Sequence, residues 1–271
     1  MINIVIWSKD RAAQLDLTLK GFKNSFKEWH DQKVNIIYTY SSPLFKAGYD
    51  LVKSFHPEFN WVLETNFRQD TLKQLFDNNL EFCSFLVDDD VFIGKFSIND
   101  PEFQLFLSND KYACLSPRLA PYVNYCYPAQ QNQLQPTFIP SKILSWDWTQ
   151  CTYDWGYPAS VASMHIYRKT DLEFIKSLNF RGANSLEGAM EGSFSRSKKL
   201  MICYKQAKCI CSTNNKVQNE NANYNANSHP VDSLNAGLLN GKRLDENINN
   251  NYVINMCHGP ISLRWKVDNA I

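Results

Sequence analysis

The sequence lacks the two glycine-rich patterns by which many proteins hold nucleotide phosphates. Neither GxGxxG nor GxxxxGKS/T occurs in its 271 residues, which argues against a dinucleotide-binding fold and against a P-loop. A strong charge of one sign is also missing, because 28 lysines and arginines nearly balance 27 aspartates and glutamates. With a net charge of +1 the chain has no global basic field, so we expect no nucleic acid as a partner.

Long apolar runs are absent as well. No stretch approaches the ~20 apolar residues with which a helix crosses a bilayer, so no transmembrane segment is expected. The N-terminus starts directly with strand-like residues 2–7 and has neither the basic nor the long apolar part of a secretion signal. These absences predict a cytoplasmic protein.

The eight cysteines lack the spacing of a zinc site. Cys209 and Cys211 form a C-x-C pair, and no CxxC elsewhere completes a set of four ligands. Cys83 and Cys114 lie in apolar runs, where a free thiol behaves as a small hydrophobic side chain. We therefore expect reduced thiols. Hydrophobic residues make up 44% of the chain and charged residues 20%, which is typical of a globular protein. A length of 271 residues allows one large α/β domain or two small ones.

Apolar runs and helical spacings alternate through the first part of the chain. Expected strands are residues 2–7, 34–40, 60–64 and 82–87, and expected helices are 15–29, 49–55 and 70–76, with Asp70 as N-cap. Strand–helix alternation of this kind predicts a parallel, doubly wound sheet. Further along we expect strands at 112–116 and 162–168, helices at 171–178 and 185–194, and one long strand or a strand pair at 200–211. Residues 121–158 read as loop, and the asparagine-rich residues 214–227 as a surface loop.

Three consecutive acids, Asp88, Asp89 and Asp90, follow the apolar run 82–87 directly. Adjacent carboxylates in a dry environment are costly unless a cation neutralises them, and oxygen ligands suit Mg²⁺ or Mn²⁺. The carboxyl ends of strands are where open α/β sheets bind ligands. Strand alternation would send Asp88 and Asp90 to one side, where they could share the metal, and Asp89 to the other. The alternative is a solvated acidic turn.

Two early arginines are candidates for phosphate binding. Arg11 follows the first strand, beside Asp10, which could accept from a base or a sugar. Arg68 precedes the helix before the acidic strand and could reach a diphosphate. The alternatives are an N-capping aspartate with a surface arginine, and a structural arginine.

Five aromatic residues lie within a dozen positions, with Asp154 among them: Trp146, Trp148, Tyr153, Trp155 and Tyr157. Aromatic rings beside carboxylates suit carbohydrate, because apolar ring faces stack while hydroxyls take hydrogen bonds. Single-stranded nucleic acid would need interleaved lysine or arginine, and none occurs between Trp146 and Tyr157. The alternative is a small core beneath a long loop.

Two later positions could complete a catalytic site. Glu187 and Glu191 share one face of the expected helix, and a carboxylate at a helix start could be a general base. His258 follows an apolar run and could supply a nitrogen ligand to the metal. A solvated acidic helix face and a structural histidine are the alternatives.

Taken together, these features resemble the GT-A glycosyltransferases. The matching parts are the first strand with Ser8-Lys9-Asp10-Arg11, the DxD motif at residues 88–90, the later acidic helix start and the late His258. The resemblance implies a single GT-A domain over residues 1–271, with a Rossmann-like α/β fold and a mixed, mostly parallel sheet flanked by helices. Residues 1–115 would bind the nucleotide sugar and residues 116–271 the acceptor, with the loop 214–227 as a flexible lid.

The resemblance also implies a role for each candidate residue. Mn²⁺ or Mg²⁺ would be held by Asp88, Asp90 and His258. The donor would contact Ser8, Asp10, Arg11, Arg68, Asp70, Asp88 and Asp89, and the acceptor would contact Trp146, Trp148, Tyr153, Trp155 and Tyr157. Glu187 would be the catalytic base, although the usual Glu-Asp pair is here Glu187-Gly188, so Asp154 is a second candidate.

The implied activity is glycan biosynthesis by a metal-dependent hexosyltransferase. It would move a sugar from a nucleotide-sugar donor, a UDP-sugar favoured, to a carbohydrate hydroxyl, with inversion if Glu187 is the base. One alternative is a nucleotidyltransferase, which would normally carry an early glycine- and lysine-bearing phosphate loop that residues 8–11 do not provide. Another is a non-catalytic carbohydrate-binding protein with a structural cation.

Overall fold

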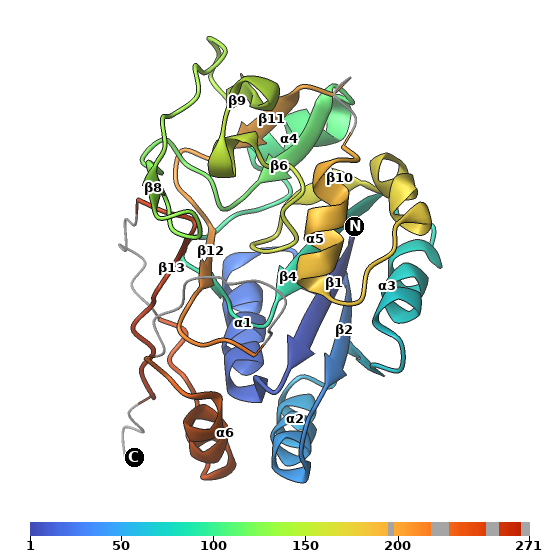
Figure 1. Ribbon diagram of the computed structural model, residues 1–271, viewed down its shortest axis with the longest axis vertical. Helices are drawn as coiled ribbons and strands as arrows, with labels where there is room; N and C mark the ends of the chain where they lie inside the picture. The colour runs from blue at the N-terminus through green and yellow to red at the C-terminus, as the bar shows by residue number, and fades with distance from the viewer. Residues whose placement is uncertain (195–197, 218–227, 248–254, 267–271) are drawn as a thin grey trace.

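A computed structural model gives the fold, and the structure describes residues 1–194, 198–217, 228–247 and 255–266. One large sheet runs through the molecule (Figure 1). In spatial order its strands are β3 (Asn60–Leu63), β2 (Lys33–Thr39), β1 (Ile2–Lys9), β4 (Phe82–Val87), β10 (Ile166–Arg168), β6 (Tyr112–Ser116), β11 (Leu200–Cys203) and β9 (Leu144–Asp147).

The first four strands of this sheet are parallel. β6 and β11 are also parallel, whereas β10 is antiparallel to both of its neighbours and β9 is antiparallel to β11. The predicted α/β class with a mixed, mostly parallel sheet is therefore confirmed. Strands from both predicted halves, 1–115 and 116–271, join in this sheet, and the assignment of donor and acceptor binding to these halves stays a prediction.

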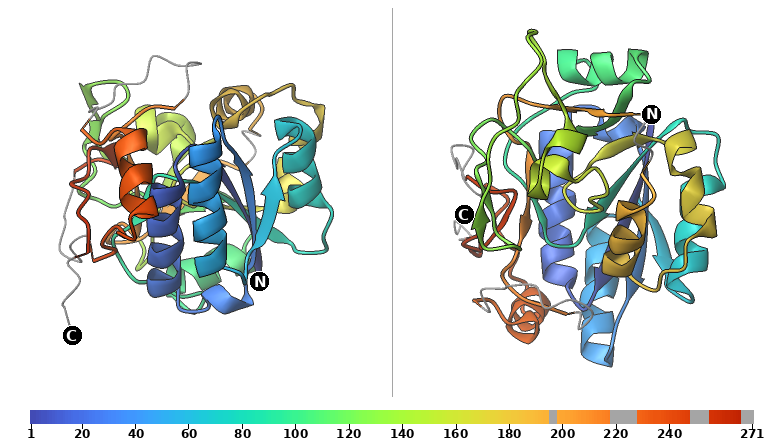
Figure 2. Two further views of the ribbon diagram at one scale, coloured as in Figure 1. Left: turned by 90° about the horizontal axis from the view of Figure 1, so that it is seen from below. Right: turned by 45° about the horizontal axis from the view of Figure 1, so that its top comes forward.

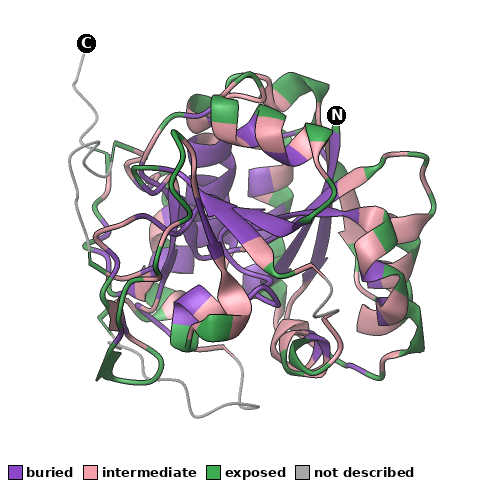
Figure 3. Ribbon diagram, turned by 90° about the horizontal axis from the view of Figure 1, so that it is seen from above, coloured by how far each residue is buried: buried purple, intermediate pink, exposed green. Residues whose placement is uncertain are grey.

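Helices cover both faces of the sheet, over two separate cores (Figure 2). One face carries α1 (Ala12–Ser25), α2 (Pro43–Phe55), α4 (Pro101–Ser108) and α6 (Val231–Leu239). The other carries α3 (Phe67–Phe76), α5 (Ala183–Glu191) and the 3-10 segment Lys169–Ser177. β1 and β4 are buried almost throughout, since both faces are covered, and this explains their continuous apolar sequences (Figure 3).

A small second sheet continues from the acidic motif. β12 (Cys209–Ser212) pairs antiparallel with β5 (Asp90–Phe92) and parallel with β13 (His258–Gly259), so that Cys211 lies between Asp90 and His258 in register. β7 (Tyr125–Cys126) and β8 (Gln131–Asn132) form a hairpin, and short 3-10 turns cover Trp29–Asp31, Trp148–Gln150 and Tyr153–Gly156. Backbone pairing therefore brings the late histidine close to the acids.

Most predicted elements are present, with several corrected bounds. The strands predicted at 82–87 and 112–116 have those bounds. The strand predicted at 162–168 begins only at Ile166, because Ser163 and Met164 have positive φ angles of 57° and 65° that no strand accommodates. Residues 200–211 form two strands that belong to different sheets.

The cap of α3 also differs from the prediction. Asn66 caps the helix by accepting from the Gln69 N–H, and Asp70 lies inside the first turn, where it accepts from the Thr65 and Asn66 N–H groups. The side chain of Asp70 therefore reaches back to the chain that enters the helix.

The loop predicted at 214–227 lies mainly outside the described residues, which here end at 217 and resume at 228. Its first residues are buried, with Asn214 bonded to the Ile261 backbone and Asn215 to Gln14. All eight cysteines are free thiols. In the described ranges, no helix has the length and apolarity that a bilayer crossing needs.

A buried charge cluster fastens the segment after α6 to α1. The carboxylate of Asp16 is fully buried, accepts from Arg243 Nε at 3.0 Å and lies 2.9 Å from His56 Nε2. Lys20 Nζ is 3.4 Å away and bridges to Glu246. Although burial opposes it, hydrogen bonds from His56 and Arg243 hold the pKa of Asp16 below its usual value. The ionised carboxylate is therefore the form that the fold stabilises.

Replacing Asp16 by alanine should lower the free energy of unfolding by about 3 kcal/mol, because Arg243, His56 and Lys20 lose their shared partner. The folded-state pKa of Asp16 lies below the unfolded value of ~3.9, so its contribution is present above that pH and is lost as the pH falls. Urea unfolding at pH 7 and pH 3.5 measures both effects. Asp50→Asn, at an exposed pair with Lys46, is the matched control and should change little. Equal stability of Asp16→Ala and wild type at pH 7 would contradict this account.

Candidate active site

A cleft of about 1170 Å³ opens at the carboxyl ends of the parallel strands. It is lined by the ends of β1 and β4 on one side and by residues of the second half on the other, including Asp154, Glu187 and His258. Ligands of open α/β sheets bind at this position. The cleft therefore collects residues that are up to 250 positions apart, from Ser8 to His258.

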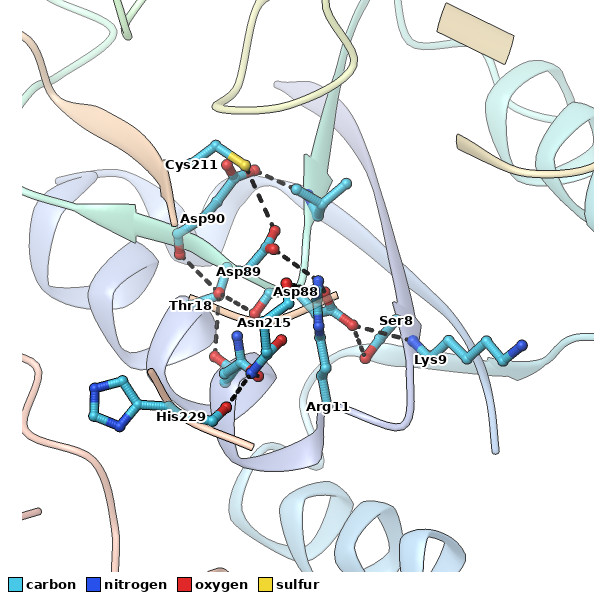
Figure 4. Close-up of polar contacts among 12 residues, drawn as sticks. Ser8, Lys9, Arg11, Thr18, Asp88, Asp89, Asp90, Cys211, Asn215 and His229 are labelled. Atoms are coloured by element: carbon cyan, nitrogen blue, oxygen red, sulfur yellow. Dashed lines mark hydrogen bonds and ion pairs between the residues drawn. The ribbon is translucent and has the colours of Figure 1, made fainter. Parts of the chain in front are cut away.

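Asp88 is held by the end of β1 (Figure 4). Its Oδ2 accepts from Ser8 Oγ at 2.8 Å and from the Lys9 backbone N–H at 3.0 Å, while Oδ1 accepts from Arg11 Nη1 at 3.0 Å. Tyr49 supports this arrangement, since its hydroxyl lies 2.6 Å from Ser8 Oγ and accepts from the Arg11 backbone N–H. Burial raises the pKa of Asp88 to about 6, and the neighbouring Arg11 limits the rise.

Asp89 lies beside Asp88 and shares its arginine. The same Arg11 Nη1 donates to Asp89 Oδ2 at 2.7 Å, and Arg11 Nη2 donates to the Asn215 carbonyl (Figure 4). Among the described residues, the hydrogen-bond partner of the other oxygen, Oδ1, is the Cys211 thiol, with Sγ at 3.6 Å. Asp88 and Asp89 form a turn after β4, so the predicted strand alternation is wrong here and these two acids, not Asp88 and Asp90, lie together.

Asp90 turns away from the cleft and is fully buried. Its carboxyl group accepts from the Val87 N–H at 2.9 Å, the Ser163 N–H at 2.8 Å and Ser163 Oγ at 2.9 Å. These bonds hold the strained left-handed backbone of Ser163. Burial raises the pKa of Asp90 to about 8 in spite of them. Both oxygens are already engaged by these donors, so this geometry does not favour the predicted ligand role of Asp90.

Glu187 lines the cleft from the middle of α5, which begins at Ala183, so this carboxylate is not at the helix start as predicted. Its Oε1 accepts from the Val161 N–H at 3.2 Å. Burial raises the pKa of Glu187 above its ordinary value, and the charge of Arg118 limits the rise. A carboxylate with a raised pKa is a stronger base, as general base catalysis near neutral pH requires. Glu191, one turn further on, also lines the cleft.

Asp154 lines the same cleft but is firmly paired. Its Oδ1 accepts from Arg118 Nη2 at 3.2 Å and its Oδ2 from Gln133 Nε2 at 2.8 Å. Although burial opposes it, Arg118 and His258 hold the pKa of Asp154 below its ordinary value. Asp154 is therefore a weaker base than Glu187. Its pairing makes it less suited than Glu187 to take a proton.

His258 lies on β13, where it pairs in register with Cys211 and contacts Arg118 and Asp154. Both ring nitrogens are within 3.5 Å of Arg118 Nη1, and Nδ1 is 3.8 Å from Asp154 Oδ1. Burial and then the charge of Arg118 lower the pKa of His258 to about 4, so the imidazole is neutral at pH 7, the form that binds metals. Among the described residues, Asp154, Cys257 and His258 are the group of metal-ligating side chains found within 4.8 Å of one another.

The aromatic cluster divides into core and cleft residues. Trp146 and Trp155 are fully buried, pack edge to face at 5.0 Å and donate to the Trp155 and Val123 carbonyls. No ring face of these two residues is open to a ligand, so their predicted acceptor contact is wrong. Tyr153 and Tyr157 line the cleft, and Trp148 lines a smaller pocket beside it. The local sequence does not separate the two groups, because a core and a binding platform use the same residue types.

Three predicted donor residues have structural partners instead. Arg68 donates to the Leu178 carbonyl at 2.8 Å and also to that of Lys176, which ties α3 to the following 3-10 segment. Asp70 completes the start of α3 as described above. Asp10 accepts from the Ser41 N–H at 2.7 Å. None of these three lines the cleft.

Arg118 is a cleft residue that the sequence analysis missed. It is 1% exposed. Its guanidinium is the positive charge that interacts with Asp154 and Glu187, and it also lies beside the ring of His258. The available signal was its position directly after the strand 112–116 and Pro117, at the same sheet edge as the acids. Ser163, the partner of Asp90, gave no such signal, because it lies 73 positions away in an irregular loop.

A comparison with known proteins identifies a relative by sequence. No protein-family model matches the chain. It is 30% identical over 192 residues to the bifunctional glycosyltransferase pgtA of Dictyostelium discoideum, a match that covers 64% of this chain and 25% of that protein. The resemblance to glycosyltransferases is thereby confirmed, and the chain spans about a quarter of the length of this relative.

Three solved structures are distant likenesses. S. aureus TarS 1-349 in complex with UDP-GlcNAc has a TM-score of 0.46 at 12% identity, covering 81% of this chain and 60% of that one. A cytidylyltransferase from Leptospira borgpetersenii scores 0.43 at 16% identity, covering 76% of each chain. The mannosyltransferase PcManGT from Pyrobaculum calidifontis, in complex with GDP-Man and Mn²⁺, scores 0.35 at 9% identity, covering 68% and 50%. All three TM-scores are below 0.5, and we draw no functional conclusion from them.

The different surroundings of Asp89 and Asp90 predict different effects on stability. Asp90→Ala leaves the Val87 and Ser163 donors without an acceptor and should lower the free energy of unfolding by about 3 kcal/mol. Asp89→Asn should cost about 1 kcal/mol or less, because Arg11 keeps Asp88. Thermal and urea unfolding of the two variants checks this. A stable Asp90→Ala beside a destabilised Asp89→Asn would reverse the assignment.

Proposed function

We propose that the protein is a metal-dependent glycosyltransferase that moves a sugar from a nucleotide-sugar donor, a UDP-sugar in the first place, to a hydroxyl of a carbohydrate acceptor. The observation that carries this proposal is the shared cleft, in which the Asp88–Asp89 pair at the end of β4 faces the same space as Glu187 on α5. The similarity to pgtA, a bifunctional glycosyltransferase by name, supports it.

The donor diphosphate would lie against the end of β1. Ser8 and Arg11 line the cleft there, and the guanidinium of Arg11 is a fixed positive charge beside the place of the diphosphate. The carboxylate of Asp88 already accepts hydrogen bonds from Ser8, Lys9 and Arg11, so its proposed role is to fix the position of these residues at the end of β1. Asp10, Arg68 and Asp70 stabilise the surrounding chain and do not line the cleft.

Two side chains at one corner of the cleft could contribute ligands to a divalent cation. Among the described residues, the partner of Asp89 Oδ1 is the Cys211 thiol, and the neutral imidazole of His258 lies on the strand that pairs with Cys211. Asp89 and His258 would hold Mn²⁺ or Mg²⁺ together with diphosphate oxygens, in place of the predicted set with Asp88 and Asp90. When bound, such an ion supplies positive charge that stabilises the departing diphosphate.

Glu187 would act as the general base. It accepts the proton of the acceptor hydroxyl, whose oxygen attacks the anomeric carbon from the face opposite the leaving diphosphate, with inversion. Arg118 balances the charge of Asp154 and Glu187, and it keeps Asp154 ionised and paired. Tyr153 and Tyr157 would contact the acceptor from the same side of the cleft.

Donor binding is tested first by thermal shift with UDP-, GDP-, CMP- and dTDP-sugars, each with and without Mn²⁺. One donor should raise the midpoint of wild type in the presence of Mn²⁺, since only the folded state binds it. Asp89→Asn should lose the Mn²⁺-dependent part of the shift, while the exposed Asp110→Asn should keep it. An undiminished shift in Asp89→Asn would remove this residue from the metal site, and no shift with any donor would contradict the proposed function.

The role of Glu187 predicts a pH profile. Glu187→Gln should lower kcat by about 100- to 10,000-fold with donor binding unchanged. Because the base must be ionised, kcat/KM of wild type should rise with pH up to a pKa above the ~4.3 of an ordinary glutamate. Release of nucleoside diphosphate measures both. Glu173→Gln, at an exposed ion pair, is the control, and an unchanged acid limb in Glu187→Gln would exclude Glu187 as the base.

A further inference from the structure

A smaller pocket of about 210 Å³ opens directly beside the main cleft. Cys151, Gly156, Tyr157 and Glu191 line both spaces, so the pocket is a side branch of the cleft and not a separate cavity. Trp148 lines only the side pocket. No step of the proposed reaction uses this space.

Residues of helix α5 line both the main cleft and the side pocket. Glu187 and Glu191 lie on the same face, one turn apart, with a rise of ~6 Å between them. Glu187, the proposed base, lines only the main cleft, whereas Glu191 lines the boundary between cleft and side pocket. One turn of this helix is close to the length of one sugar unit in a glycan chain. A hydroxyl held at Glu187 would therefore place the next sugar unit at Glu191.

The side pocket has the chemistry that a sugar unit needs. The indole of Trp148 is partly exposed, and its ring is fixed because Nε1 donates to the Lys198 carbonyl at 2.8 Å. Such a fixed aromatic face can stack on the apolar face of a sugar, while the carboxylate of Glu191 accepts from hydroxyl groups. Gly156 allows the two backbone segments that line the branch point to pack closely, since a Cβ at this position would clash with the Cys151 backbone carbonyl.

We propose that the side pocket is a second acceptor subsite, which binds the sugar unit next to the one that receives the transferred sugar. It follows that an acceptor of two or more sugar units binds better than a single sugar unit. This inference rests on the proposed function, because it names the acceptor class of the same cleft. It also gives Trp148 the carbohydrate contact that Trp146 and Trp155, buried in the core, cannot make.

Acceptor kinetics with the donor found by thermal shift test the subsite. Each of four disaccharides is compared with the methyl glycoside of its terminal sugar: lactose, cellobiose, α-mannobiose and chitobiose. For the pair that is used, Trp148→Ala should raise KM of the disaccharide roughly tenfold and leave KM of the methyl glycoside unchanged. Trp61→Ala is the matched control, because Trp61 is also partly exposed and also donates to a backbone carbonyl, that of His56, outside the cleft.

A binding measurement that needs no turnover separates this inference from the proposed function. Cys151 lines the side pocket and is the partly exposed member of eight cysteines, the other seven being buried. A disaccharide in the subsite should slow the alkylation of Cys151 by iodoacetamide. Mass spectrometry measures the alkylated fraction of Cys151 over time. The protection should be lost in Trp148→Ala and kept in Trp61→Ala.

The outcomes are distinct. Absence of nucleoside diphosphate release with every donor and acceptor would overturn the proposed function, whatever the alkylation shows. Release with equal KM changes for both members of a pair in Trp148→Ala would overturn the second subsite alone. So would a failure of all four disaccharides to protect Cys151 in wild type.

Discussion

Three consecutive carboxylates at the end of a buried strand are the constraint on which this structure depends. Asp88, Asp89 and Asp90 are all at most 9% exposed, and unpaired charges at such positions would cost several kcal/mol each. Each acid is compensated in a different way. Asp88 takes donors from the end of β1, Asp89 shares the guanidinium of Arg11, and Asp90 takes backbone and hydroxyl donors from Val87 and Ser163.

These compensating contacts also assemble the cleft. Arg11 joins the first strand–helix loop to the acids and to Asn215, which lies 204 positions further along the chain. Asp90 opens β5, whose pairing with β12 and then β13 carries His258 to the same corner. Its carboxyl group fixes Ser163, and the chain around Ser163 leads to Val161, which donates to Glu187. The contacts that compensate the three acids therefore also position the proposed catalytic groups.

The sequence predicted much of this, but not the orientation of its side chains. The parallel half of the sheet and the place of the acids follow from apolar runs that end in charge, a local signal. Which oxygen faces the cleft is decided by the turn at Asp88 and Asp89 and by Ser163, and neither contact is visible in local periodicity. Similarly, Trp146 and Trp148 are two positions apart, a spacing that a continuous strand would place on one face. However, β9 ends at Asp147, and the 3-10 turn after it places Trp148 at a pocket while Trp146 lies in the core.

In the proposed function, one corner of the cleft, between Asp89 and His258, takes a cation together with a nucleoside diphosphate. Anomalous scattering of manganese from crystals soaked with Mn²⁺ and UDP tests it most directly. The account predicts one manganese peak with an oxygen of Asp89 among its ligands, Asp90 still bonded to Ser163, and the diphosphate beside Arg11. A peak coordinated by Asp90, or a nucleotide bound outside the cleft, would contradict it.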